Sequence, residues 1–219
     1  MRKHLNLATI EAAVVDLDGT MVDTLGDFEA AIGAMLADLR LLPTEPGFIA
    51  RMIGKGSEHL VRETLRNRGA TAERFGEGWA GYQSHYAAVN GRHARVYPGV
   101  SEGLDAMRRR GWRLACVTNK PLHFADALLA MTGLRAHFAF VFGGDSFERR
   151  KPDPLPLLEA CRALGSTPAA TLVVGDSSND ALAARAAGCP VVLVRYGYNH
   201  GEPVESVDCD GLVERLDAM

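Results

Sequence analysis

The 219-residue sequence has few of the features that mark specialised classes of protein. It contains only four cysteines, and none are spaced as Cys-x-x-Cys, so neither a zinc site nor a disulfide framework is predicted. No uncharged apolar run approaches the roughly 20 residues that span a bilayer. Residues 1–10 lack the apolar stretch typical of a secretion signal. We therefore expect a cytoplasmic protein that does not associate with membranes.

The sequence also lacks an excess of charge of either sign. Its 24 Lys and Arg residues and 27 Asp and Glu residues give a net charge of −3. Proteins that bind nucleic acid through bulk positive charge have a basic balance, so we do not expect a nucleic-acid partner. Hydrophobic residues make up 47% and charged residues 23%, the usual balance of a globular protein. A chain of this length can bury a substantial core.

Five short apolar runs, rich in Val, Leu and Phe, stand out along the chain. Such runs are typical of strands that are buried on both faces of a parallel sheet. Helical patterns separate the last four runs, and a glycine follows each of these patterns, which is the usual end signal of a helix. The alternation predicts an α/β fold with a doubly wound parallel sheet. The runs cover 12–15, 114–117, 138–142, 172–174 and 191–194, and the helices are expected at 100–110, 122–131, 154–164 and 179–187.

A long interruption separates the first two apolar runs. Between residues 23 and 97 we find no clear strand, and helical patterns occupy 28–39, 48–53, 58–68 and 71–89. We interpret this block as a helical cap domain inserted into the α/β domain. The predicted division is a core of residues 1–22 and 97–219 and a cap of residues 23–96. Residues 20–25 and 92–98 are the expected hinges.

Polar residues follow four of the five apolar runs. Ligands of open α/β sheets bind beyond the carboxyl ends of the strands, so these residues should meet at one edge. Any one of them could be only a turn former or a helix cap. Several carboxylates crowded together require a cation, and oxygen ligands without His or Cys indicate a hard ion, most plausibly Mg²⁺. The segments are Asp16-Leu17-Asp18-Gly19-Thr20, Thr118-Asn119-Lys120, Gly143-Gly144-Asp145 followed by Lys151-Pro152, and Gly175-Asp176-Ser177-Ser178-Asn179-Asp180.

These segments resemble the motifs of the haloacid dehalogenase superfamily. Asp16-Leu17-Asp18-Gly19-Thr20-Met21-Val22-Asp23 is similar to the first motif. Thr118, Lys151 and residues 175–180 are similar to the second, third and fourth motifs. The helical block between the first two motifs matches the position of that superfamily's cap. The resemblance covers essentially the whole chain and implies hydrolase or phosphotransfer chemistry.

Asp16 and Asp18 are the predicted catalytic pair. Asp16 can attack phosphorus and form an aspartyl-phosphate. Asp18 lies two residues further, so in an extended segment its side chain falls on the same face, where it could protonate the leaving alcohol and then activate water. The dehalogenases of the superfamily lack this second aspartate because a halide needs no proton. Asp18 therefore favours phosphoryl transfer.

Three residues are predicted to bind the substrate's phosphate, because phosphoryl transfer depends on positioning and charge neutralisation. Thr118 and the backbone amides around Asn119 can bind its non-bridging oxygens. Lys151 can bind the same phosphate and keep Asp16 ionised.

The resemblance also implies a set of metal ligands. Mg²⁺ would bridge Asp16 and the phosphate, with the Asp18 backbone carbonyl and the Asp176 side chain as its other protein ligands. Asp180 would be a further ligand or would orient a bound water.

The cap is expected to act as a lid that restricts substrates to small phosphorylated metabolites. Within it, Gly54-Lys55-Gly56-Ser57 opens a helix, where Lys55 could bind the carboxylate of a short phosphorylated acid. The alternative is that Lys55 is a solvated lysine in a turn. Residues 196–203 and Asp23-Thr24 resemble the corresponding segments of bacterial phosphoglycolate phosphatases. This resemblance implies hydrolysis of 2-phosphoglycolate to glycolate and phosphate.

Alternative functions remain open at this point. The nearest are a sugar-phosphate phosphatase of broader range and a phosphomutase of the β-phosphoglucomutase type. A phosphorylated receiver module also combines Asp, Thr, Lys and Mg²⁺, although it would need neither Asp18 nor a cap. The oligomeric state is expected to be a monomer or a homodimer.

Overall fold

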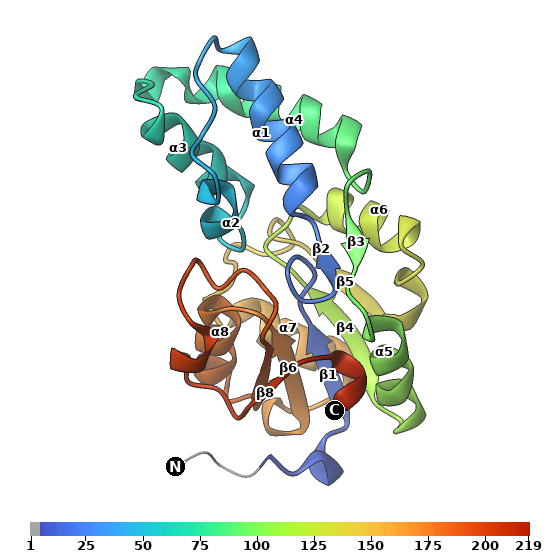
Figure 1. The fold of residues 1–219 in the computed structure, drawn as a ribbon. Helices are drawn as coiled ribbons and strands as arrows, with labels where there is room; N and C mark the ends of the chain where they lie inside the picture. The colour runs from blue at the N-terminus through green and yellow to red at the C-terminus, as the bar shows by residue number, and fades with distance from the viewer. Residues whose placement is uncertain (1–4) are drawn as a thin grey trace.

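A six-stranded sheet forms the lower lobe of the computed structural model, which describes residues 5–219 (Figure 1). The strand order is β5-β4-β1-β6-β7-β8, and every neighbouring pair is parallel. The predicted α/β class is therefore confirmed, with one additional strand, β8, at the edge. The strands are β1 (Ala12–Val15), β4 (Arg113–Val117), β5 (Phe140–Phe142), β6 (Thr171–Gly175), β7 (Val191–Val194) and β8 (Gly211–Val213).

Helices cover both faces of this sheet. Alternate residues of β1 point to opposite faces: Ala13 and Val15 belong to one buried hydrophobic cluster, and Ala12 and Val14 belong to another. Both sides of the central strand are buried, which explains its uninterrupted apolar sequence. Helices α5 (Val100–Arg109) and α6 (Leu122–Met131) contribute to the first cluster, and α7 (Leu155–Leu164) and α8 (Ser178–Ala187) contribute to the second.

Four helices form the upper lobe, which has its own hydrophobic cluster (Figure 1). Helices α1 and α4 pack side by side, and Met35 of α1 and Tyr82 of α4 are fully buried. The pattern at 71–89 was expected to be one helix, but a 3₁₀ turn at Ala72–Arg74 precedes α4. The helices are α1 (Leu25–Asp38), α2 (Phe48–Met52), α3 (Ser57–Asn67) and α4 (Phe75–Val89). We refer to this lobe as the cap.

A two-stranded ribbon connects the cap to the sheet. Strand β2 (Val22–Asp23) pairs antiparallel with β3 (Arg95–Val96), so the two expected hinge segments lie side by side. The buried side chain of Asp27 reinforces this junction, because its two oxygens accept hydrogen bonds from the backbone N–H groups of Gly91 at 2.7 Å and His93 at 2.8 Å. The predicted domain boundaries fall at this ribbon, and the division itself remains a proposal.

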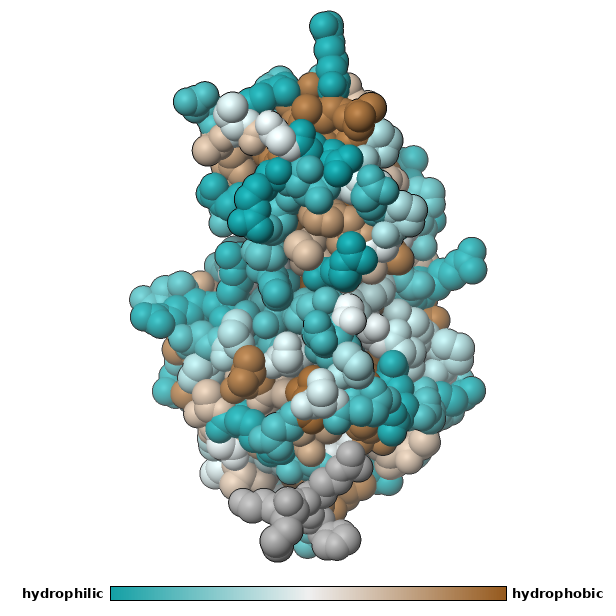
Figure 2. Space-filling model, turned by 60° about the vertical axis from the view of Figure 1, so that its left-hand side comes forward, coloured by the Kyte–Doolittle hydropathy of each residue, from teal (hydrophilic) through white to brown (hydrophobic). Residues whose placement is uncertain are grey.

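The outer surface is mostly polar on the face drawn in Figure 2, where hydrophobic residues gather only in small patches. Within residues 5–219, no helix is long and apolar enough to cross a bilayer.

Candidate active site

The carboxyl ends of the central strands bring the predicted residues to one edge of the sheet. Asp16 directly follows β1, Thr118 follows β4 and Asp176 follows β6, and all three are buried. The cap covers this edge and leaves a cavity of about 20 Å³ between the two lobes. Such a volume holds only about one or two water molecules. Entry of a substrate therefore requires the cap or its side chains to move.

Three carboxylates form a cluster that fits a divalent cation. One oxygen each from Asp16, Asp176 and Asp180 lies within 4.8 Å of the others. Burial raises the pKa of Asp16 to about 7, although the neighbouring Lys151 partly offsets this effect. Burial, followed by the charges of Asp180 and Asp16, raises the pKa of Asp176 well above its usual range. A cation would relieve this crowding, and an all-oxygen donor set suits a hard ion.

Gly19 allows the carboxylate of Asp176 to reach this cluster. Its backbone has a φ of +82°, in the left-handed region that favours glycine. A Cβ atom at this position would lie 2.2 Å from Asp176 Oδ2. Gly19 of the first motif therefore leaves room for Asp176 of the fourth motif, which lies far away in the sequence.

Lys151 connects Asp16 to the fourth motif. Its Nζ atom lies 2.8 Å from Asp16 Oδ1 and 2.7 Å from Asp180 Oδ1, and it donates to the backbone oxygen of Val117 at 2.8 Å. Burial lowers the pKa of Lys151, but the two carboxylates outweigh burial and raise it above its usual value. The lysine therefore stays charged beside Asp16, but its charge offsets only part of the effect of burial on the pKa of Asp16, which is still raised to about 7.

Asp180 also holds the loop that carries Asp176. Its Oδ2 atom accepts hydrogen bonds from Ser177 Oγ at 2.9 Å and from the Ser177 backbone N–H at 3.2 Å. This side chain therefore has a structural role in addition to its place in the cluster. Direct ligation of the metal by Asp180 remains a prediction.

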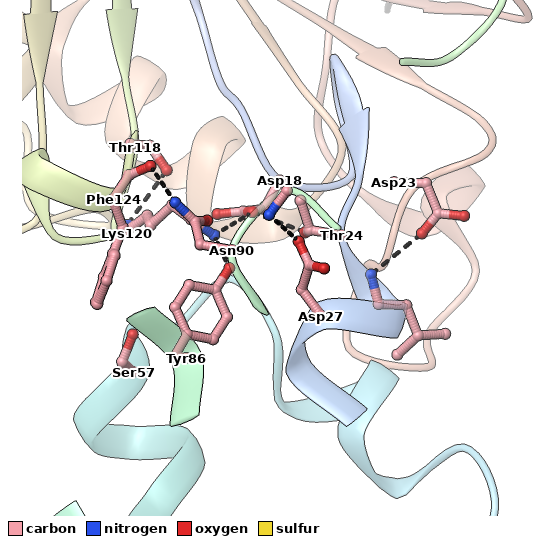
Figure 3. Close-up of polar contacts among 12 residues, drawn as sticks. Asp18, Asp23, Thr24, Asp27, Ser57, Tyr86, Asn90, Thr118, Lys120 and Phe124 are labelled. Atoms are coloured by element: carbon pink, nitrogen blue, oxygen red, sulfur yellow. Dashed lines mark hydrogen bonds and ion pairs between the residues drawn. The ribbon is translucent and has the colours of Figure 1, made fainter. Parts of the chain in front are cut away.

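The Asp18 side chain lines the same cavity but is not one of the three clustered carboxylates. Its Oδ1 atom accepts hydrogen bonds from Thr24 Oγ1 at 2.7 Å and from Lys120 Nζ at 2.8 Å (Figure 3). Both partners lie at the junction with the cap, and the charge of Lys120 draws the carboxylate there. The Asp18 carboxylate therefore lies apart from the carboxylates of Asp16, Asp176 and Asp180.

The side chain of Asn119 binds backbone oxygens of both lobes. Its side-chain amide donates to the backbone oxygens of Gly54 and Lys151, each at 2.8 Å. Asn179 donates to the same Gly54 oxygen at 3.0 Å. The side chain of Asn119 therefore joins a cap loop to the core, while phosphate binding by the nearby backbone amides remains a prediction.

The structure places Lys120, and not Lys55, at the cavity. Lys55 is exposed and is not among the residues that line the cavity, although Gly54, Gly56 and Ser57 are. Lys120 lines the cavity and is buried. Lys120 belongs to the segment after β4, but motif spacing indicates no role for it, because its contact with Asp18 joins residues 102 positions apart. The exposure of Lys55 favours its alternative role, a solvated lysine in a turn, over binding of a carboxylate.

Tyr198 is a second site residue whose role the motifs do not indicate. Its backbone N–H donates to Asp176 Oδ2 at 2.7 Å. Its hydroxyl oxygen accepts a hydrogen bond from the Thr24 backbone N–H at 2.9 Å, at the start of the cap. The segment that resembles phosphoglycolate phosphatases therefore links the carboxylate cluster to the hinge.

Comparison with protein-family models gives a match to the haloacid dehalogenase-like hydrolases over residues 10–188. The matched region contains all four motifs and the whole cap. The chain belongs to the haloacid dehalogenase-like hydrolases.

Several relatives of this hydrolase carry the name phosphoglycolate phosphatase. The protein of Thiobacillus denitrificans is 44% identical over 211 residues, which cover 94% of this chain and 92% of that protein. A plasmid-encoded protein of Cupriavidus necator is 46% identical over 210 residues, covering 95% of this chain and 90% of its own length. The crystal structure of a predicted phosphoglycolate phosphatase from Haemophilus somnus matches with a TM-score of 0.90 and 32% identity, covering 95% and 96% of the two chains.

Proposed function

We propose that this haloacid dehalogenase-like hydrolase is a Mg²⁺-dependent phosphatase that converts 2-phosphoglycolate to glycolate and phosphate. The observation that carries the proposal is the separation of the Asp16 and Asp18 carboxylates at the sheet edge. Asp16 lies against Lys151 at 2.8 Å, while Asp18 turns away toward the cap. This arrangement provides a nucleophile and a separate proton-transfer group. The names of the relatives that match nearly the whole chain support the choice of substrate.

The proposed reaction has two displacements at phosphorus. In the first, an Asp16 oxygen forms a bond to phosphorus while the ester bond to glycolate breaks, and Asp18 gives its proton to the departing glycolate oxygen. In the second, Asp18 takes a proton from water, whose oxygen attacks phosphorus and releases Asp16 and phosphate. Lys151 and Thr118 bind the non-bridging oxygens in both steps. Mg²⁺, when held by Asp16, Asp176 and the Asp18 carbonyl, supplies charge neutralisation.

The cavity supports a small substrate over a sugar phosphate. Its cap side consists largely of the apolar side chains of Phe28, Met52, Ile53 and Leu60, which offer no hydrogen bonds to sugar hydroxyl groups. Family membership as a hydrolase also argues against the receiver alternative. A cytoplasmic location and a monomeric or homodimeric state remain predictions.

A substrate panel tests the proposed function. Purified enzyme with Mg²⁺ is supplied with 2-phosphoglycolate, 3-phosphoglycerate, glucose 6-phosphate and β-glucose 1-phosphate, and kcat/KM is measured from phosphate release. We expect 2-phosphoglycolate to be the best substrate. Faster release from a sugar phosphate would favour the broad-range phosphatase, and isomerisation of β-glucose 1-phosphate without net phosphate release would favour the phosphomutase.

A further inference from the structure

Lys120 is a buried cation in the cavity that the proposed reaction does not use. Its side chain is 1% exposed, and its Nζ atom donates to Asp18 Oδ1 at 2.8 Å and to the Tyr86 hydroxyl oxygen at 2.5 Å (Figure 3). The ammonium also lies 4.6 Å from the ring centre of Phe28 and 4.8 Å from that of Tyr86. Lys120 therefore occupies the junction of core and cap, beside the proton-transfer group.

The two cations that line the cavity differ in how fully they are bonded. Lys151 has three acceptors, Asp16, Asp180 and the Val117 carbonyl, for its three N–H bonds. Lys120 has two acceptors for the same number of N–H bonds. Of the described residues that line the cavity, Lys120 is thus the cation with an N–H bond that has no protein acceptor.

The position of Lys120 fits the second charge of a short phosphorylated acid. In 2-phosphoglycolate, the carboxylate carbon is only two bonds, of roughly 1.5 Å each, from the ester oxygen. Asp18 must reach that ester oxygen to protonate it. Because Lys120 Nζ lies 2.8 Å from Asp18 Oδ1, a carboxylate attached two bonds away is within reach of Lys120.

We infer that Lys120 is a specificity-determining residue that binds the carboxylate of the substrate, so that the enzyme selects phosphate esters of 2-hydroxy acids. The inference rests on the proposed function. The apolar cap side chains exclude water from this ion pair, which strengthens it. A 3-phosphorylated acid carries its carboxylate one bond further from the ester oxygen and fits this position less well. An uncharged leaving group leaves Lys120 paired with Asp18 alone.

Two non-hydrolysable analogues test the inference through binding. In 3-phosphonopropionate a CH₂ group replaces the ester oxygen of 2-phosphoglycolate, and in propylphosphonate a methyl group replaces the carboxylate as well. Their inhibition constants are measured with Mg²⁺ against hydrolysis of phenyl phosphate. We expect the wild-type enzyme to prefer 3-phosphonopropionate by about tenfold or more, as for a charged hydrogen bond. Lys120→Met should remove most of this preference.

Lys55→Met is the matched comparison, because it makes the same chemical change at the other candidate lysine. We expect it to retain the preference for 3-phosphonopropionate. Lys120→Gln, which keeps hydrogen-bond donors beside Asp18 and Tyr86, is a second variant, and thermal unfolding checks that each variant is folded. Among the turnover measurements, kcat/KM of the Lys120 variants should fall at least about tenfold more for 2-phosphoglycolate than for phenyl phosphate.

Three outcomes would overturn the inference. One is the absence of a carboxylate preference in the wild-type enzyme, which needs no variant to fold. Another is an equal loss on both substrates with the preference intact, which would mean that Lys120 only positions Asp18. The third is a loss of preference in Lys55→Met and not in the Lys120 variants. A wild-type enzyme that prefers 3-phosphonopropionate but does not hydrolyse 2-phosphoglycolate would instead contradict the proposed function.

Discussion

Asp16 carries the proposed chemistry at the scale of a single residue, and its substitution should separate activity from folding. Asp16→Asn removes a carboxylate from a crowded buried cluster, so the free energy of unfolding without metal should change little. Turnover should fall by ~1,000-fold or more, because an amide does not form the aspartyl-phosphate. Phosphate release and circular dichroism measure the two effects. Near-wild-type hydrolysis by this variant would contradict the covalent mechanism.

Gly19 provides a second residue-scale prediction. Gly19→Ala places a methyl group 2.2 Å from Asp176 Oδ2 at a φ of +82°, so it should weaken metal binding and lower the free energy of unfolding. Titration calorimetry with Mg²⁺ and urea unfolding measure these changes.

The control for this prediction is Gly33→Ala in helix α1, where an added Cβ atom meets nothing within 4 Å. That change should leave metal binding intact and stabilise the protein by roughly 0.5–1 kcal/mol. If Gly19→Ala bound Mg²⁺ as tightly as Gly33→Ala does, the cluster would not depend on this close approach.

At the scale of elements, the ribbon of β2 and β3 depends on Asp27. Asp27→Asn replaces one of two acceptor oxygens with an amide nitrogen, which cannot accept from Gly91 or His93. We expect a loss of about 1–3 kcal/mol in the free energy of unfolding. Hydrogen exchange of the Gly91 and His93 amides should accelerate if the loss is local. Unchanged exchange at both amides would show that the side chain does not hold the ribbon.

The elements also show which parts of the molecule could be predicted from sequence. The apolar runs located five strands because continuous Val and Leu residues are required where both faces are buried, as in β1. Strand β8 was not predicted because it is short, begins with Gly211 and is only half-buried. The motifs predicted that Asp16, Lys151 and Asp176 lie at the same edge of the sheet, since the carboxyl ends of parallel strands coincide.

The direction of side chains within that edge was harder to predict. Asp18 turns toward the cap because Lys120 and Thr24 attract it, and Lys120 lies in the loop after β4, far along the chain. Lys55 has the chemistry expected of a carboxylate-binding residue, but its side chain is exposed while its neighbours line the cavity. Periodicity and motif spacing carry no information about such tertiary choices.

At the scale of the whole molecule, activity should depend on a metal that joins segments from both ends of the chain. Asp16 and Asp176 follow the neighbouring strands β1 and β6, and their charges need a cation. Chelation should therefore abolish turnover, and added Mg²⁺ should restore it. Ca²⁺ should restore little, because it accepts a larger and looser coordination shell. Full activity after exhaustive chelation would contradict a metal-dependent mechanism.

The pairing of β2 with β3 has a consequence for how such an enzyme can diversify. Asp23 and Arg95 are direct partners across the ribbon, so the chain leaves the sheet and returns to it at almost the same point. The cap lies entirely between these two residues, so it forms an inserted segment whose two ends are adjacent. Lineages can therefore lengthen, shorten or exchange this inserted segment without moving the strands of the sheet. New substrates can arise by remodelling one continuous stretch of gene, while the chemistry below stays unchanged.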